Sequence, residues 1–293
     1  MTDLSTLVAE ELALPVDPRV TAMAAAVAAL YPGAARAVLF YGSCLREREL
    51  DGLMLDFYLI VSSYREAYGR GWYAFANRLV PPNVFPFEHE GLAAKYAVLS
   101  EADFLRENGP EAGTVSVWAR FAQPSRLVWA KDEAARAAAV TAVRRAAPTL
   151  FGFALPMVAA AERGDPLAVW RRGFDLTYDS ELRAERKGKS LSIVDTEPER
   201  YRRFGAAALP LANPLTPEKA RRRWGRFRRK GKTMSVLRLA KATTTFAGGV
   251  DYLAWKINRH AGTEIVVKPW QRRWPILGAL TLLPRLLRRG AIR

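Results

Sequence analysis

The sequence predicts an α+β fold in which a mixed sheet with helices comes first, a helical region follows, and a basic segment lies at the C-terminal end. Two apolar runs, residues 38–41 and 53–61, have the length and composition of buried strands. From about residue 131 onward, Ala- and Arg-rich runs with helical spacing replace such runs. The net positive charge lies still later in the chain.

The opening section is expected to contain, in order, a helix, a strand, a Gly-Ser turn, a short helix and a second strand. Further short strands are expected at residues 94–99 and 127–130. The Pro-rich residues 81–87 indicate a loop, and residues 114–121 fit either a helix or a strand. Helices are expected at residues 19–30, 64–79, 132–147, 149–162, 167–182, 198–208 and 233–260, the last with a break at its paired glycines.

The composition is that of a globular protein, because half of the 293 residues are hydrophobic and a quarter are charged. A single cysteine, Cys44, excludes an intramolecular disulfide and suits a reducing compartment. Only two histidines are present, His89 and His260, which makes a zinc hydrolase or a Ser-His-Asp triad unattractive. The acidic start of the chain does not resemble a signal peptide, so a cytosolic start is expected.

The formal net charge of +16 is unevenly distributed along the chain. Residues 218–293 contain 20 Lys and Arg against 3 Asp and Glu, a net charge of +17. Residues 1–217 contain 25 basic and 26 acidic side chains, a net charge of −1. A nearly neutral body with a basic quarter favours a polyanionic partner, either nucleic acid or an anionic membrane surface.

One stretch, VLFYGSCLRERELDGLMLDFYLIV, joins the first two expected strands and contains a carboxylate inside an apolar run. In nucleotidyltransferases, backbone N–H groups of such a turn, here Gly42 and Ser43, hold triphosphate oxygens at a helix N-terminus. The strand carboxylate, here Asp56, binds the Mg²⁺ ion that bridges the phosphates. A salt bridge is the other interpretation of Asp56, and Asp51 in the preceding turn fits a solvated side chain better than a ligand.

The apolar stretch at residues 275–287 is too short to cross a bilayer, which takes about 20 residues. Its flanking Trp270, Trp274 and arginines match a segment that lies in the lipid headgroup region. Two alternatives stay open. The segment can be a core helix, or the basic run at residues 221–232 can bind RNA with Trp224 and Phe227 stacking on bases. The apolar tail favours the membrane surface.

These motifs, taken in order, resemble the mitochondrial translocator assembly and maintenance type of phosphatidate cytidylyltransferase (CDP-diacylglycerol synthase) and its bacterial relatives. The resemblance spans most of the chain. The matching segments are Tyr41-Gly42-Ser43, Met54-Leu55-Asp56-Phe57, the spaced Trp72, Asn77 and Asn83, Lys95-Tyr96-Ala97-Val98, Trp118-Ala119-Arg120-Phe121 with Gln123-Pro124, residues 177–183, and Tyr252 with Lys256. This sequence departs from the family pattern at several positions. Ala119 and Ser180 replace glycines, Glu181 stands where the family has Asp, and the His expected after Asn83 is not clearly present.

The resemblance implies a nucleotidyltransferase-like domain at residues 1–131 and a small helical, winged-helix-like domain at residues 132–217. It further implies a basic amphipathic membrane-binding segment at residues 218–293. The implied reaction joins CTP and phosphatidic acid into CDP-diacylglycerol and releases pyrophosphate with Mg²⁺. The expected location is peripheral, on the cytoplasmic face of the inner membrane, and nucleic acid is an unlikely partner.

The resemblance also assigns roles to individual residues. Asp56 and Glu181 are expected to be catalytic and to bind the metal, with Glu181 supplying the second carboxylate from the helical region. The residues expected to bind CTP or the lipid phosphate are Gly42, Ser43, Lys95, Arg120 and Arg183. Two other functions stay open: a soluble nucleotidyltransferase that acts on RNA or another acceptor, and a membrane-associated protein without activity.

Overall fold

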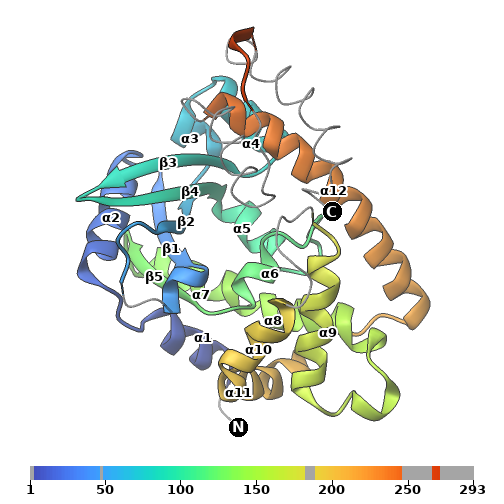
Figure 1. Cartoon of the computed structure of the whole chain (residues 1–293). Coiled ribbons are helices and arrows are strands. Elements are labelled where there is room, and N and C mark those ends of the chain that lie inside the picture. The colour runs from blue at the N-terminus through green and yellow to red at the C-terminus, as the bar shows by residue number, and fades with distance from the viewer. Residues whose placement is uncertain (1–2, 47–48, 182–188, 246–265, 271–293) are drawn as a thin grey trace.

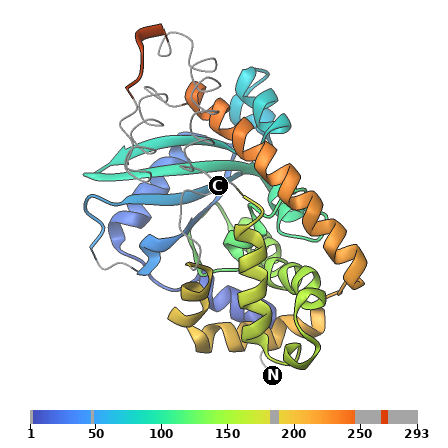
Figure 2. The ribbon, with the colours of Figure 1, turned by 45° about the vertical axis from the view of Figure 1, so that its right-hand side comes forward.

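The computed structural model describes residues 3–46, 49–181, 189–245 and 266–270. Five strands form one open sheet in the order β3-β4-β2-β1-β5 (Figures 1 and 2). The strands are β1 (Ala35–Tyr41), β2 (Met54–Val61), β3 (Asn83–His89), β4 (Leu92–Ser100) and β5 (Ser125–Ala130). β2 and β4 are parallel and the other neighbours are antiparallel, so the predicted α+β class with a mixed sheet is confirmed.

Both faces of the sheet are covered, which explains why β1 and β2 are apolar at nearly every position. Leu39 and Tyr58 project to one face, where they join a hydrophobic cluster that includes residues of α1 (Leu4–Leu12) and α7 (Glu133–Arg144). Phe40 and Phe57 project to the other face and pack with α2 (Pro18–Ala29). The alternation of strand side chains therefore assigns each strand residue to one of two cores.

The remaining helices follow the sequence-based expectations in part: helices at residues 101–107 and 189–196 were not expected, and the last described helix begins at Pro217 instead of near residue 233. They are α3 (Tyr64–Tyr68), α4 (Trp72–Leu79), α5 (Glu101–Glu107), α6 (Trp118–Phe121), α8 (Ala146–Ala154), α9 (Pro166–Tyr178), α10 (Lys189–Thr196), α11 (Pro198–Ala208) and α12 (Pro217–Thr245). Aspartate side chains cap α2, α7 and α9 by accepting hydrogen bonds from backbone N–H groups of the first turn. The single helix expected over residues 64–79 is divided at Gly69, where φ is 66°.

Three expectations about local structure are corrected. The expected loop at residues 81–87 is mostly strand β3, which tolerates Pro86 because it lies at the edge of the sheet. The helix expected at residues 149–162 ends at Ala154 and continues only as short 3₁₀ turns. Helix α1 was not expected, because the sequence there indicated only an acidic start; its buried leucines show why it forms.

The basic run at residues 221–232 belongs to α12, and its two aromatic side chains face inward. Trp224 and Phe227 are buried against Trp118 and Phe153, with ring centroids 5.3–6.4 Å apart. The indole Nε1 of Trp224 donates a hydrogen bond to the carbonyl of Phe153 at 2.9 Å. These rings are core residues, which disagrees with the alternative in which they stack on RNA bases.

One hydrophobic cluster contains residues from both sides of the two predicted domain boundaries, near residues 131 and 217. A largely buried ion pair between Arg200 of α11 and Glu11 of α1, at 2.8 Å, adds a polar contact across the first boundary. The described part of residues 132–217 is helical, and its winged-helix character stays a prediction. Among the described helices, none combines the length and apolar content needed to cross a bilayer.

Candidate functional site

Three polar side chains form a row across the sheet at the point where β1 ends. Tyr41 of β1 is opposite Asp56 of β2, and Asp56 is opposite Lys95 of the parallel strand β4. Residues directly opposite on neighbouring strands project to the same face, so all three side chains face the helical part of the molecule. The hydrophobic strands thus place one carboxylate and one ammonium group together.

Asp56 forms an ion pair with Lys95, with 3.0 Å between Lys95 Nζ and Asp56 Oδ1. The two side chains are 21% and 30% exposed, respectively, so water and ligands reach the pair. This ion pair agrees with the salt-bridge interpretation of Asp56, and its accessibility leaves the carboxylate available to a ligand. A pair at this level of exposure stabilises the fold by about 1 kcal/mol at most.

The Gly-Ser turn lies directly over this carboxylate. Gly42 has a φ of 97°, a backbone conformation that residues other than glycine rarely adopt. A Cβ at this position would lie 3.2 Å from Asp56 Oδ2. Ser43 is exposed and begins a 3₁₀ turn that extends to Arg46. Glycine is therefore required at this position for two reasons: the backbone conformation and the close approach to Asp56.

A pocket of about 160 Å³ opens beside the row, and we call it the cationic pocket. Its lining includes the three basic side chains Lys95, Arg120 and Arg238, which come from β4, α6 and α12. The other lining residues are Tyr41, Phe57, Tyr58, Pro82, Val84, Ala97 and Ser116. Three cations around a small volume favour an anion, such as a phosphate group.

A buried network holds the pocket's arginines. Glu181 is 7% exposed and accepts a hydrogen bond from the Ser116 hydroxyl, and its Oε1 lies 3.7 Å from Arg120 Nη1. Arg120 also donates to the Ser116 carbonyl, and Arg238 Nη1 donates to the Ser116 hydroxyl at 2.7 Å. Burial alone would lower the pKa of Arg120, but Glu181 and neighbouring groups raise it, so the guanidinium stays charged.

The two tyrosines of the pocket stay neutral hydrogen-bond donors. Burial, and then the negative charge of Asp56, raise the pKa of Tyr41 well above its ordinary value. Burial also raises the pKa of Tyr58. Neither phenol can therefore serve as a base near neutral pH. The charged groups of the site are the lysine, the arginines and the two carboxylates.

Of the residues singled out by sequence, Gly42, Asp56, Lys95, Arg120 and Glu181 lie in or beside the cationic pocket. Ser43, the second residue of the turn, begins the 3₁₀ helix. Arg183, Tyr252 and Lys256 lie outside the described residues. The resemblance also pointed to Asn77 and Asn83, which are buried and hydrogen-bond to the backbone, including the carbonyls of Val98 and Tyr73.

Sequence reasoning missed Ser116 and Arg238. Arg238 reaches the pocket because α12 runs back along the body (Figure 1), and it also donates to the carbonyl of Pro81 at 2.8 Å. The only signal in the sequence is the spacing of Arg238 and Lys241, which puts two cations on one helical face. That pattern is common on solvated helices and does not by itself indicate a site.

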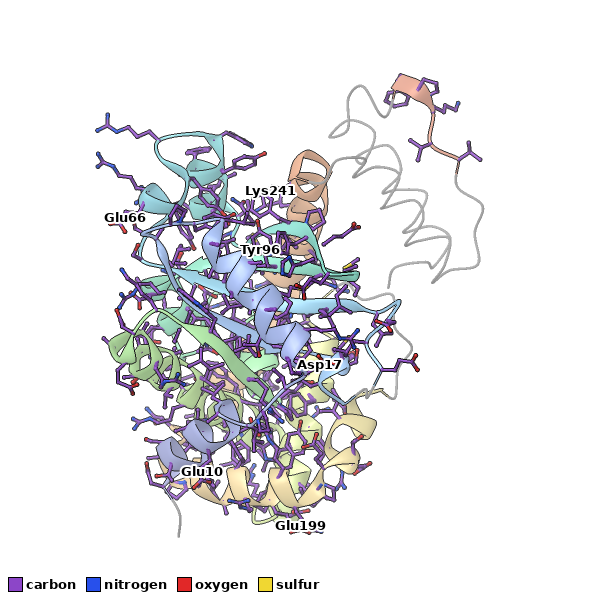
Figure 3. The ribbon with its side chains drawn as sticks, turned by 90° about the vertical axis from the view of Figure 1, so that its left-hand side faces the viewer. Glu10, Asp17, Glu66, Tyr96, Glu199 and Lys241 are labelled. Carbon is purple, nitrogen blue, oxygen red and sulfur yellow. The ribbon has the colours of Figure 1, made fainter. Side chains whose placement is uncertain are left out.

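Lys241, which is labelled in Figure 3, anchors the α4–β3 loop to α12. Its ammonium group donates to the carbonyls of Val80 and Pro82. Burial, and then the charge of Arg238, lower the pKa of Lys241 to about 7. In the unfolded chain the pKa of Lys241 stays near 10.5. Between about pH 7 and pH 10.5 the unfolded chain therefore binds more protons at this residue than the folded chain does.

The folded state therefore gains stability relative to the unfolded state as the pH rises through this window. Unfolding free energies of the natural chain and of Lys241→Met are to be compared at about pH 7 and about pH 9. The unfolding free energy of the natural chain minus that of the variant is expected to rise by roughly 1–2 kcal/mol between these two pH values. A difference that does not change with pH would contradict a lowered pKa.

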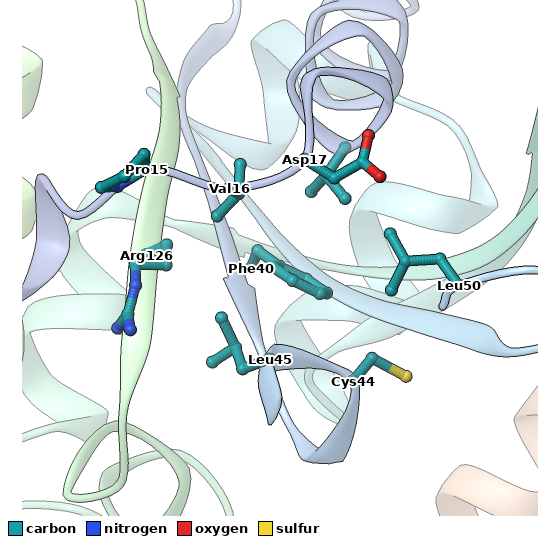
Figure 4. A pocket seen from close by; sticks show the side chains of 9 residues that line it. Pro15, Val16, Asp17, Phe40, Cys44, Leu45, Leu50 and Arg126 are labelled. Carbon is teal, nitrogen blue, oxygen red and sulfur yellow. The ribbon is translucent and has the colours of Figure 1, made fainter. Parts of the chain in front are cut away.

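A larger pocket, of about 380 Å³, lies between α2, η1 (Ser43–Arg46) and β5 (Figure 4). Its lining is mostly apolar, including Val16, Phe40 and Leu50, with Asp17 and Arg126 at its border. Phe40 and Arg126 are opposite each other on neighbouring strands, on the sheet face that Asp56 does not occupy. Despite its size, this pocket lacks the convergent charges of the cationic pocket.

Within the described residues, no group of three or more His, Cys, Asp or Glu side chains is arranged to hold a metal ion. Asp56 and Glu181 each stand next to a basic side chain instead. Comparison of the chain with models of protein families found no match, and comparison with curated proteins found none. The chemistry of the site must therefore be inferred from its geometry.

Proposed function

We propose that the protein is a nucleotidyltransferase. The observation that carries this proposal is the Gly42–Ser43 turn, which lies over Asp56 and opens beside a pocket with three basic side chains. Backbone N–H groups of such a turn, with a serine hydroxyl, suit phosphate oxygens. Lys95, Arg120 and Arg238 supply the positive charge that a triphosphate and an anionic acceptor require.

The particular reaction we propose is that of a phosphatidate cytidylyltransferase. An oxygen of the phosphatidic acid phosphate attacks the α-phosphorus of CTP, the bond between that phosphorus and the bridging oxygen breaks, and pyrophosphate leaves with the electron pair. The attacking phosphate is already ionised near neutral pH, so no residue needs to remove a proton. This agrees with a site in which both tyrosines are neutral and in which, among the described residues, no histidine lines the pocket.

The donor set fits a magnesium ion that is bound together with the substrate. Mg²⁺ is usually held by one or two carboxylates plus phosphate oxygens and water, and Asp56 supplies one accessible carboxylate beside the phosphate-binding turn. When bound, Mg²⁺ would neutralise phosphate charge. Asp56 would hold the ion, while Lys95 would be released toward the phosphates. Glu181 as a second ligand stays a prediction, since here it holds Arg120 and Ser116.

The basic C-terminal quarter supports a lipid acceptor. Its net charge of +17 favours an anionic bilayer, to which each Lys or Arg near the surface adds about 1 kcal/mol of attraction. RNA is the weaker candidate, because the aromatic side chains of the basic run are buried in the core. We place the protein at the cytoplasmic face of the inner membrane, bound peripherally.

The test is pyrophosphate release from CTP by the purified full chain with Mg²⁺ and vesicles that contain phosphatidic acid. Turnover is expected with CTP and phosphatidic acid together and not with either one alone. ATP, GTP and UTP serve as alternative nucleotides, and RNA as an alternative acceptor. Turnover with RNA would overturn the lipid acceptor. The absence of both turnover and Mg²⁺-dependent nucleotide binding in every arm would overturn the proposed enzymatic function.

Gly42→Ala gives a prediction specific to the turn. Alanine at a positive φ is expected to destabilise the fold by roughly 1–2 kcal/mol. Its methyl group, placed 3.2 Å from Asp56 Oδ2, is also expected to reduce turnover by about tenfold or more, because it displaces the carboxylate. Gly52→Ala is the matched control, since Gly52 has a φ of 73° and open space around it.

Unfolding curves and turnover rates are to be measured for both glycine variants. A similar loss of stability in both, with a loss of turnover only in Gly42→Ala, is the expected pattern. Equal turnover in the two variants would show that the close approach of Gly42 to Asp56 has no part in the reaction.

A further inference from the structure

Helix α4 exposes a stripe of large apolar side chains. Trp72, Phe75 and Leu79 are 59%, 59% and 65% exposed, although side chains of this type are usually buried. Their spacing of three and four residues places them on one face of the helix, and the Trp72 and Phe75 ring centroids are 5.8 Å apart. Asn77, on the opposite side of the helix, is buried, and so is Ala76 at the edge of the stripe. We call these three residues the α4 stripe.

The charged side chains near the α4 stripe in the sequence are mostly basic. Residues 64–79, which form α3 and α4, contain the exposed Arg65, Arg70 and Arg78 and one acidic residue, Glu66. A short helix with aromatic and leucine side chains on one face, and arginines around it, is typical of a segment that lies in the interfacial region of an anionic bilayer. A protein partner offers no reason for these exposed arginines unless it is itself acidic.

The α4 stripe is also next to the cationic pocket. Only two residues separate Leu79 from Pro82, which lines that pocket. Arg238 and Lys241 of α12 hydrogen-bond to the carbonyls of residues 80–82, so this loop is fixed to the helix that leads into the basic C-terminal segment. Figures 1 and 2 show α4 beside the C-terminal end of α12.

We propose that the α4 stripe inserts into the headgroup region of an anionic lipid bilayer and turns the cationic pocket toward the membrane surface. This inference rests on the proposed function, to which it adds a membrane contact in the body of the protein, separate from the C-terminal segment. Trp72, Phe75 and Leu79 enter the lipid, and the three arginines contact lipid phosphates. The acceptor phosphate then meets the pocket without leaving the bilayer.

The test uses the full chain and vesicles of phosphatidylcholine mixed equally with phosphatidylglycerol, in a flotation assay. The variant Trp72→Ser/Phe75→Ser/Leu79→Ser is expected to bind these vesicles about tenfold more weakly or worse, since three inserted apolar side chains are lost. The matched control is Leu14→Ser/Leu211→Ser, whose leucines are 50% and 52% exposed. Leu14 follows α1 and Leu211 lies in the 3₁₀ turn after α11, and Figure 3 shows Glu10 of α1 and Glu199 of α11 at the end of the molecule opposite Lys241.

A variant that binds vesicles as well as the natural chain would overturn the proposal. In that case, a change in thermal stability would indicate that another part of the chain covers the stripe, and a change in oligomeric state would indicate a second copy. A second measurement does not depend on the triple variant: Leu79→Cys labelled with an environment-sensitive fluorophore, with the natural chain, whose Cys44 is buried, carried through the same labelling as control. Its emission is expected to shift to the blue on vesicles, and no shift would also overturn the proposal.

A further assay separates this inference from the proposed function. With a water-soluble, short-chain phosphatidic acid, the triple variant is expected to retain the turnover of the natural chain. With vesicles it is expected to lose most of it. If the natural chain shows no turnover with either lipid, the proposed function fails, while vesicle binding still decides whether α4 contacts the membrane.

Discussion

Asp56→Asn is expected to reduce pyrophosphate release from CTP and phosphatidic acid by about a thousandfold or more, equivalent to roughly 4 kcal/mol of lost transition-state stabilisation. Asparagine retains the shape of the side chain but removes the negative charge that would hold Mg²⁺ beside the Gly42–Ser43 turn. The fold should be little affected, because the Asp56–Lys95 pair is partly exposed. The measurement is the steady-state rate at saturating CTP, with an unfolding curve of the same preparation.

Asp51→Asn is the matched control for this variant. Asp51 lies in the turn before β2, its side chain is 67% exposed, and it pairs with Arg19 at 2.9 Å. Its neutralisation is expected to change the rate by no more than about twofold. A rate for Asp56→Asn within about tenfold of the natural chain would remove Asp56 from the reaction and would favour a purely structural ion pair with Lys95.

Trp224→Ala is expected to destabilise the protein by about 3–5 kcal/mol. The indole is 1% exposed, packs on Trp118 and Phe227, and donates a hydrogen bond to the carbonyl of Phe153. Its loss leaves a cavity where α12 meets the rest of the core, and it leaves a buried carbonyl without its partner. The measurement is the free energy of unfolding by denaturant.

Trp72→Ala provides the comparison, since Trp72 is 59% exposed and is expected to change the unfolding free energy by about 0.5 kcal/mol or less. This pair of variants also separates the two interpretations of the basic run. If Trp224 stacked on RNA bases, its removal would weaken RNA binding and leave stability nearly unchanged. A loss of stability below about 1 kcal/mol would contradict the core role that the structure gives to this residue.

The sequence was sufficient for the elements whose local pattern is strong. The apolar runs before and after the Gly-Ser turn predicted β1 and β2 because strands buried on both faces are apolar at successive positions. The aspartates at the starts of α2 and α7 mark helix N-termini, and the Ala-rich runs after them fix the helical period. β3 was missed because three prolines and an asparagine within residues 81–87 indicate a turn, and only its edge position makes a strand acceptable.

By itself, the sequence determined the turn over Asp56, the basic C-terminal quarter and most helices, because these depend on neighbouring residues and on composition. Only the tertiary structure decided which groups meet at the site. The parallel register of β2 and β4 brings Lys95 to Asp56, and α12 brings Arg238 to Ser116 over a separation of 122 residues. It also decided that Trp224 lies in the core while Trp72 is exposed. Such pairings depend on strand order and helix packing, which local pattern and propensity do not specify.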